Sequence, residues 1–538
     1  MIQIKKFRRK IMKRSKLTGL AVSAASVLFA TGLTACGGAD ASKGDATKAQ
    51  SNNVLVYAGE AEKMINPLLN THGELETIVF SGLTKYDGSG KPIEDLAEKY
   101  QYNDANETYT FTLRKGVKWH DGKDFNADDV VYTYKQLTEN KDISASVKSN
   151  YEDIKEIKKI DDFTVEFKLD HYDAAMLDYF SIGILPKHIC EGQDINTMDF
   201  NQHPVGTGKY KFESWDTAGG MITLNKNENY YGNVPKISKV VYKTVSVEST
   251  KATMLQSGEA DFAWLNSKYA KQFEGNDAFK QWEFTTADYR GAAMDMKTDF
   301  WKQNADSIGV LNYALDKEQI VKNVLLGQGA PAYSPIQRNP LGTNKDADIY
   351  PYDLNKFAKE MENLGWKKGA DGIYERNGQK FSFTVQTRDF EEERVDIANV
   401  MSDMLKKAGV EMKVVLVNKF DWKAGYNGFL AGYATQFDPD MIYAQYVTNA
   451  SSNNMSYSNP EIDKLLEEGR HEKDPVKRKA IYGEFEKEYA KKPGVLLVAY
   501  LQGNYVGTSK LKGPDTQRVL GHHAVGVLWN IEEWTIEK

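Results

Sequence analysis

The chain has 538 residues, of which 41% are hydrophobic and 12% aromatic, and its formal net charge is -6. This length exceeds what one hydrophobic core supports, so we expect two or three lobes, and the apolar content excludes disorder over most of the chain. The acidic balance disfavours a nucleic-acid-binding surface, for which a basic face is typical.

The N-terminal sequence is typical of an export signal. Residues 1–16 carry eight lysines and arginines and no acid, and residues 17–32 are apolar or small throughout. This apolar run is too short to span a bilayer comfortably, so we predict a signal peptide over residues 1–35. Its end, LTACG, looks like a bacterial lipobox and places a lipid on Cys36. Loss of the signal lowers the formal net charge to about -14.

Residues 36–53 are polar, so we predict a flexible tether. Cys190 is the second of the two cysteines. With Cys36 committed to lipid, we expect no structural disulfide. The run VLVY at residues 54–57 predicts the first buried strand of the folded part.

Residues 108–137 predict a strand, a turn and a capped helix. Tyr109, Phe111 and Leu113 alternate with threonines, which is the pattern of a strand with one buried face. A basic turn follows, and Asn126 then offers an N-cap oxygen to a helix whose apolar side continues to Leu137.

The sequence from Phe111 to Val130 resembles the signature of the family-5 extracellular solute-binding proteins, the oligopeptide, dipeptide and nickel binders of ABC importers. The family pattern runs roughly F-x-L-R-x-G-V-x-[FW]-H-D-G-x-x-[FL]-x-A-x-D-V, and nearly every position is satisfied. The resemblance extends over residues 54–538 and includes ILPKH at 184–188, PVGTGKY at 204–210 and YSNPEID at 457–463.

The resemblance implies an α/β fold of the large type II periplasmic-binding-protein class. It has two main lobes with mixed sheets joined by crossover strands, and a smaller peripheral α/β lobe. We expect lobe I to comprise residues 54–81, 201–289 and 505–538, the peripheral lobe residues 82–200, and lobe II residues 290–504.

Further elements follow from local patterns and from the resemblance. A phosphate loop at residues 203–210 is excluded because His203 and Tyr210 stand where that motif needs glycine and Ser or Thr. We expect the glycines of residues 203–210 to allow a tight crossover of the chain between lobes. The other expected elements are strands at 163–169, 240–244, 412–417 and 496–500, a helix, glycine and strand at 255–264, a hairpin around 371–378, and helices at 311–320, 353–366, 397–408 and from 459.

The resemblance also implies ligand contacts. In many peptide binders of the family an aspartate at the position of Thr435 pairs with the ligand's ammonium group, and a hydroxyl cannot replace that charge. Three candidates have a simpler alternative: a solvated glutamate for Glu60, a core aromatic residue for Trp264 and an Asp-Pro turn for Asp438. The candidate contacts are Glu60, Trp264, Tyr433, Thr435 and Asp438.

Enzymatic motifs are missing. The chain has no G-x-S-x-G or H-E-x-x-H motif, and adjacent His522 and His523 do not share a helix face as zinc ligands at i and i+4 would. Eight histidines and two cysteines leave little for a metal site. We therefore expect no enzyme activity, metal or cofactor.

The resemblance implies a monomeric receptor, anchored by lipid to the outer face of the bacterial cell membrane. It would capture peptides in an interlobe cleft and deliver them to the permease subunits of an ABC importer. A nickel chelate, an oligosaccharide or haem is the alternative solute. A surface sensor or adhesin and a hydrolase are the alternatives outside transport.

Overall fold

The computed structural model describes residues 53–70, 73–339, 341–342, 350–421, 423–435 and 437–537. The predicted signal peptide, Cys36 and all but the last residue of the tether lie outside the described residues. In these ranges no helix is both long enough and apolar enough to cross a membrane.

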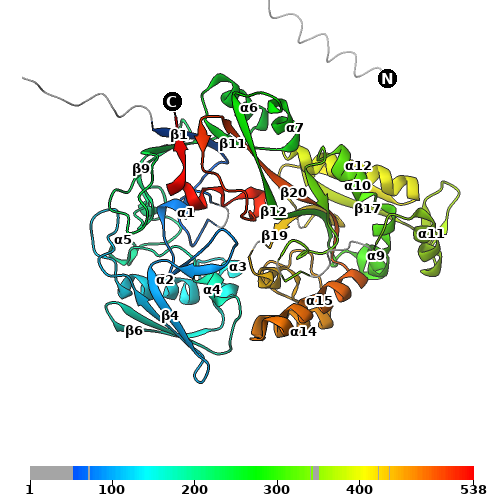
Figure 1. Cartoon of the computed structure of the whole chain (residues 1–538). Coiled ribbons are helices and arrows are strands. Elements are labelled where there is room, and N and C mark those ends of the chain that lie inside the picture. The colour runs from blue at the N-terminus through cyan, green and yellow to red at the C-terminus, as the bar shows by residue number, and fades with distance from the viewer. Residues whose placement is uncertain are drawn as a thin grey trace, which may run out of the picture. The chain divides into compact units, whose positions relative to one another are not determined.

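An eleven-stranded sheet organises the chain around its two longest strands, β12 (Phe279–Met294) and β20 (Val495–Thr508), which lie antiparallel side by side (Figure 1). On one side of this pair follow β19 (Gly428–Ala434), β17 (Ser382–Arg388) and β18 (Glu411–Val417). On the other side follow β11 (Phe262–Leu265), β1 (Val54–Gly59), β10 (Lys239–Thr244), β9 (Met221–Lys226) and β8 (Tyr210–Asp216), and β13 (Gly329–Pro331) pairs with β20.

The sheet is mixed. Strands β1 and β10 pair in parallel, as do β17 and β18, whereas β12 and β20 are antiparallel to their neighbours β19 and β11. The predicted fold class is confirmed: two main α/β lobes are joined by crossing strands, and a smaller lobe lies at the periphery.

The pairing of β12 with β20 has a gap between Thr285 and Tyr289 and a further shift of register between Arg290 and Gly291. It runs from Phe279 to Thr285, and it resumes at Tyr289 in a shifted register. In the gap Arg338 donates hydrogen bonds to the carbonyl oxygens of Thr286 and Leu501, both at 2.9 Å. The break therefore separates the two halves of the sheet, and an arginine holds both long strands there.

The peripheral lobe contains a four-stranded antiparallel sheet of β4 (Ala97–Asn103), β5 (Thr108–Leu113), β7 (Thr164–Leu169) and β6 (Ile154–Asp161). Helix α2 (Ala127–Glu139) packs against β6 and β7. Its N-terminus is a capping box, because Asn126 accepts the Asp128 N–H while Asp129 accepts the Asn126 N–H. The predicted strand, turn and capped helix are confirmed.

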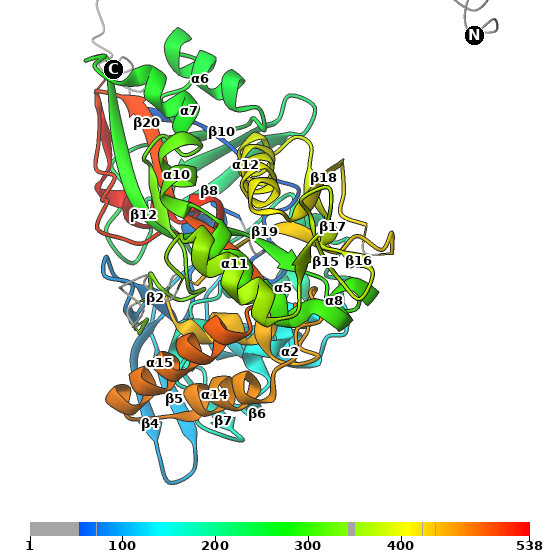
Figure 2. The same cartoon turned by 90° about the vertical axis from the view of Figure 1, so that its right-hand side faces the viewer.

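Helix α12 (Glu392–Ala408) covers β17 and β18 and ends at Gly409, whose φ of +101° suits glycine. Helices α14 (Pro460–His471) and α15 (Pro475–Lys491) pack side by side (Figure 2). The other α-helices are α1 (Glu76–Val79), α3 (Ala145–Lys148), α4 (Met176–Tyr179), α5 (Lys187–Cys190), α6 (Glu248–Ser257), α7 (Ser267–Ala270), α8 (Asp299–Asn304), α9 (Ile308–Leu311), α10 (Lys317–Asn323), α11 (Leu354–Asn363) and α13 (Tyr443–Tyr446).

Short strands and 3-10 helices complete the description. The strands are β2 (Thr84–Tyr86), β3 (Pro92–Glu94), β14 (Lys367–Lys368), β15 (Tyr374–Arg376), β16 (Gln379–Lys380), β21 (Leu511–Lys512) and β22 (Thr535–Ile536). The 3-10 helices are η1 (Ser149–Tyr151), η2 (Asp199–Asn201), η3 (Lys271–Phe273), η4 (Ala305–Ser307), η5 (Asn312–Ala314), η6 (Pro439–Ile442), η7 (His522–Ala524) and η8 (Val527–Glu533).

One expected helix is wrong. Residues 311–320 do not form a single helix, because the Asp316 side chain accepts the Gln319 N–H and caps a new helix, α10, at Lys317. Gly206 and Gly208 serve close packing: a Cβ there would lie 1.8 Å from the Val79 oxygen and 2.5 Å from the Ile78 oxygen, respectively.

Two buried ion pairs anchor the segment after β19. Arg478 makes two hydrogen bonds of 2.6 Å to the Asp438 carboxylate. Arg470 binds Asp440 through two hydrogen bonds of 2.9 and 2.8 Å, and the Tyr179 hydroxyl of the peripheral lobe donates to the same carboxylate at 2.7 Å. These pairs therefore fix the segment to α14, α15 and the peripheral lobe.

Replacing Arg478 with Met should lower the free energy of unfolding by about 3–5 kcal/mol, because it leaves the Asp438 carboxylate buried without its partner. Urea unfolding followed by circular dichroism measures this loss. Lys487→Met is the matched control, since Lys487 pairs with Glu484 on the exposed face of α15 and should change stability by less than about 0.5 kcal/mol. Equal effects of the two substitutions would contradict the prediction.

Candidate functional site

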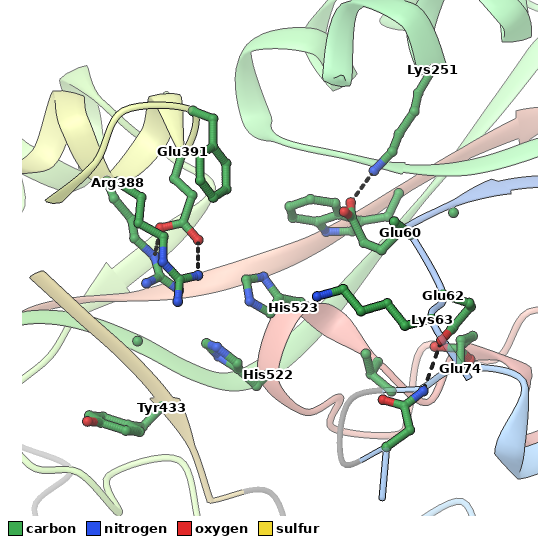
Figure 3. A pocket seen from close by; sticks show the side chains of 18 of the residues that line it. Glu60, Glu62, Lys63, Glu74, Lys251, Arg388, Glu391, Tyr433, His522 and His523 are labelled. Carbon is green, nitrogen blue, oxygen red and sulfur yellow. Dashed lines mark hydrogen bonds and ion pairs between the residues drawn. The ribbon is translucent and has the colours of Figure 1, made fainter. Parts of the chain in front are cut away.

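A cavity of about 780 Å³ lies between the two sides of the sheet (Figure 3). One wall is formed by residues 59–63, which follow β1, and by Trp264 of β11. The facing wall is formed by the end of β17, the start of α12 and residues 431–433 of β19, and residues 522–525 close it. Its size is within the range of binding sites for small molecules.

Glu60 lies at one wall beside a buried lysine. Lys251 of α6 is fully buried and forms an ion pair with Glu60, whose side chain is 51% exposed. It also pairs with Glu248 at 3.2 Å and lies over the Trp264 ring at 5.2 Å. The Trp264 Nε1 is buried without a hydrogen-bond partner. This wall therefore presents the Glu60 carboxylate to the cavity.

Two arginines lie on the facing wall. Arg388 and Arg394 both pair with Glu391, at 3.2 and 3.3 Å, so two guanidinium groups share one carboxylate and these three groups carry one net positive charge. Burial and the nearby Arg290 lower the pKa of Arg394 to about 10, and it stays charged at neutral pH. The excess positive charge suits an anionic group of a solute.

His522 and His523 are held by a buried carboxylate. The Asp288 carboxylate contacts His522 Nδ1 at 2.9 Å and accepts the His523 backbone N–H at 3.0 Å, and it also pairs with Arg290. Burial alone would raise the pKa of Asp288, but Arg290 and His522 hold it below its usual range. Burial lowers the pKa of both histidines, so both imidazoles are neutral at neutral pH.

Three glutamates lie near Asn70 at the end of the cavity, Glu62 partly buried and Glu74 and Glu76 buried. The Asn70 amide donates to Glu62 and Glu76, both at 2.9 Å. Glu74 accepts the backbone N–H groups of Gly526 at 2.8 Å and Leu528 at 3.0 Å. Burial raises the pKa of Glu62 and of Glu74 to about 7, so these acids change charge near neutral pH.

Strand β19 reaches the cavity with one edge only partly paired. It pairs with β12 over its whole length, whereas its pairing with β17 covers only Gly428 and Phe429. Ala431, Gly432 and Tyr433 lie beyond that pairing and line the cavity. An extended chain could therefore add its main-chain N–H and C=O groups to this edge.

The cavity brings together three of the five predicted contacts, Glu60, Trp264 and Tyr433. Thr435 and Asp438 do not line it. The Thr435 hydroxyl donates to the Pro335 carbonyl at 2.8 Å, and Asp438 caps η6 and pairs with Arg478. Contact of any of the five with a solute stays a prediction.

Sequence reasoning missed Arg388, Arg394 and the two histidines as lining residues. Arg388 ends a parallel strand, and ligands of open α/β sheets bind at the carboxyl ends of such strands, so its position was a usable signal. The histidines were considered only as a helical metal motif. Their place depends on Asp288, more than 230 residues earlier, and no local pattern reveals that contact.

A model of the family described as bacterial extracellular solute-binding proteins, family 5, middle part, matches residues 91–460. The chain belongs to this family. The match covers the four-stranded sheet of the peripheral lobe, most of the crossing sheet and the cavity-lining residues of β11, β17, α12 and β19.

Several proteins of the family are similar over nearly the whole chain. The oligopeptide-binding protein AppA of Bacillus subtilis is 31% identical, and the match covers 98% of this chain and all of AppA. The solved structure of NikZ from Campylobacter jejuni in complex with Ni(L-His) has a TM-score of 0.82 at 32% identity, covering 90% of this chain and 99% of NikZ. The structure of B. subtilis AppA with a nonapeptide has a TM-score of 0.78 at 29% identity, covering 90% and 99%.

The glutamates of the cavity predict a pH dependence of stability in this family-5 protein. The pKa of Glu62 rises from 4.5 to about 7, so between these values the folded state holds a proton that the unfolded chain has lost. Its stabilising contribution is full below pH 4.5 and is lost as the pH rises through 7. Glu62→Gln should match the wild type below pH 4.5 and be more stable above pH 7 by about 1–3 kcal/mol.

Thermal unfolding of both proteins between pH 4 and 8 tests this prediction. Glu98→Gln is the control, because Glu98 is an exposed glutamate of β4 and its substitution should give no pH-dependent difference. A constant difference between Glu62→Gln and the wild type across this range would contradict the assignment.

Proposed function

We propose that this solute-binding protein captures peptides in the 780 Å³ cavity and delivers them to an ABC importer. The partly paired edge of β19 carries the proposal, because an extended peptide can pair its main chain with residues 430–434 whatever its side chains are. The opposite wall, residues 59–63, begins at the end of β1.

The charges of the two walls suit the two ends of a peptide. The terminal ammonium group would lie near the carboxylates of Glu60 and Glu62, and the terminal carboxylate would lie near Arg388 and Arg394. This arrangement needs no charge at Thr435, which does not line the cavity. The nonapeptide complex of the similar protein AppA supports a peptide as the solute.

A metal chelate is the second candidate. His522 and His523 lie at the cavity with neutral imidazoles, and the hydrogen bond of His522 to a carboxylate is a common arrangement for metal-binding histidines. Within the described ranges no group of three or more His, Cys, Asp or Glu side chains could hold a metal ion, so a chelate would bring its other ligands with it. The Ni(L-His) complex of the similar protein NikZ favours this candidate.

The protein acts by binding in either case. Two lobes joined by crossing strands can close around a solute, and the closed state is favoured by contacts that exist only when both walls touch it. We infer that the protein is monomeric and that permease subunits of the importer receive the solute from it. A sensor or adhesin would share the cavity, but its gene would not lie beside genes for a permease and an ATPase.

Arg388→Met should weaken binding of peptides with a free C-terminus about tenfold and leave binding of amidated peptides unchanged, because only the former place a carboxylate at the arginines. Intrinsic tryptophan fluorescence of protein stripped of solute by unfolding and refolding measures both affinities. Lys413→Met on β18 is the control, since Lys413 does not line the cavity. No response of the wild type to any peptide, with a response to Ni(II)-histidine, would reject the peptide in favour of the chelate.

Cys36→Ser should move the protein from the membrane fraction to the medium or periplasm, because the thioether to lipid needs the Cys36 sulfur. Immunoblots of fractionated cells measure this distribution, with Cys190→Ser as the control. Cys190 is buried in α5 and its substitution should leave the protein at the membrane. A variant Cys36→Ser that stays with the membrane would exclude the lipid anchor.

A further inference from the structure

A second cavity, of about 290 Å³, lies beside the first, and Asn70 and Val525 line both. It forms where three distant parts of the chain meet: Tyr86 of β2, Phe437 after β19, and the C-terminal segment that carries Arg518 and Trp529. The rings of Tyr86 and Phe437 stack with centroids 3.6 Å apart.

Arg518 is the distinctive group of this cavity. Only 8% of the residue is exposed, and its guanidinium carbon lies 5.2–5.7 Å from the ring centroids of Tyr86, Phe437 and Trp529. Among the described residues its side chain has no ion pair within 4.0 Å and no hydrogen-bond acceptor, and its Nε is buried without a partner. The Trp529 Nε1 is likewise buried without a partner.

The other cations of the cavity are already neutralised. Lys85 pairs with Asp95 at 3.4 Å, and Lys209 pairs with Glu532 and donates to the Trp529 carbonyl at 2.6 Å. Glu74 and Asp87 act on Arg518 only from beyond ion-pair distance. Burial lowers the pKa of Arg518 to about 10, so it remains charged at neutral pH.

This environment is unfavourable for an arginine unless an anion completes it. Burying a charged group without a hydrogen-bonded partner costs several kcal/mol, and the three rings supply attraction to the cation but no acceptor for its N–H groups. The guanidinium presents a planar fork of N–H donors that matches a carboxylate. A group with two oxygens would satisfy the donors that the protein leaves unused.

We propose that the second cavity is an oxyanion subsite in which Arg518 holds a carboxylate beside the Trp529 ring. The carboxylate belongs either to a solute that extends from the first cavity, a source that rests on the proposed function, or to a free carboxylic acid. The subsite itself requires only the residues around Arg518.

The Trp529 indole N–H gives a direct signal for occupancy. Protein labelled with ¹⁵N-tryptophan and stripped of solute is titrated with sodium acetate, with sodium chloride at matched ionic strength as the control. A second titration uses an equimolar pool of alanine peptides of two to five residues, and a third uses the same pool with amidated C-termini. Trp529→Phe assigns this signal, and the indole N–H signal of Trp264, assigned with Trp264→Phe, reports the first cavity independently.

We expect acetate or the free-acid peptides to shift the Trp529 signal with saturation, and Arg518→Gln to weaken that response at least tenfold. A shift with acetate alone identifies a free carboxylic acid, and it leaves the subsite valid even if no peptide binds the first cavity. A shift with free-acid but not amidated peptides identifies the solute as the source. The subsite is excluded if neither probe moves the signal, or if the shift is the same in Arg518→Gln.

Stability separates a binding role from a structural one. Arg518→Met should leave the Tm of the stripped protein unchanged or raise it, because it removes a buried charge without removing an ion pair. Arg478→Met, in which a paired arginine is lost, should lower the Tm clearly under the same conditions. An equal loss of Tm in both variants would assign Arg518 to the scaffold and overturn the proposal.

Discussion

The buried charge of Asp288 determines how the two halves of the crossing sheet meet. It lies in the short stretch of β12 that β20 does not pair, and a carboxylate buried there is stable only with partners. Arg290, the His522 ring and the His523 backbone N–H supply them. These contacts fix the C-terminal segment against β12 and place the two histidines at the first cavity. The same segment contains Arg518, which lines the second cavity.

The gap in the β12–β20 pairing divides the sheet into two sides, and the two cavity walls carry different charged residues. Each side of the sheet contributes its own charged set: Lys251 supports Glu60 on one side, and Glu391 joins Arg388 and Arg394 on the other. On the proposed function, a solute that contacts both walls gains more binding energy than one that contacts a single wall.

Local patterns predicted most of the fold. Alternation at Tyr109, Phe111 and Leu113 and the cap at Asn126 are properties of neighbouring residues, and the structure has them as expected. The site was predicted only in part, because Asp438 is defined by Arg478, 40 residues away, and the place of His522 by a contact across 234 residues. Contacts between residues so far apart in the sequence depend on the order of the strands in the sheet. No local sequence pattern reveals that order.

The unpaired edge of β19 also bears on how such proteins diverge. A receptor that binds the main chain, which is common to all peptides, leaves discrimination to a few side chains that line the cavity, such as Arg388, Arg394 and His522. Point substitutions there can redirect the cargo while the scaffold is inherited unchanged. Relatives named for an oligopeptide and for a nickel complex, each about a third identical to this chain over its length, are what that mode of evolution produces.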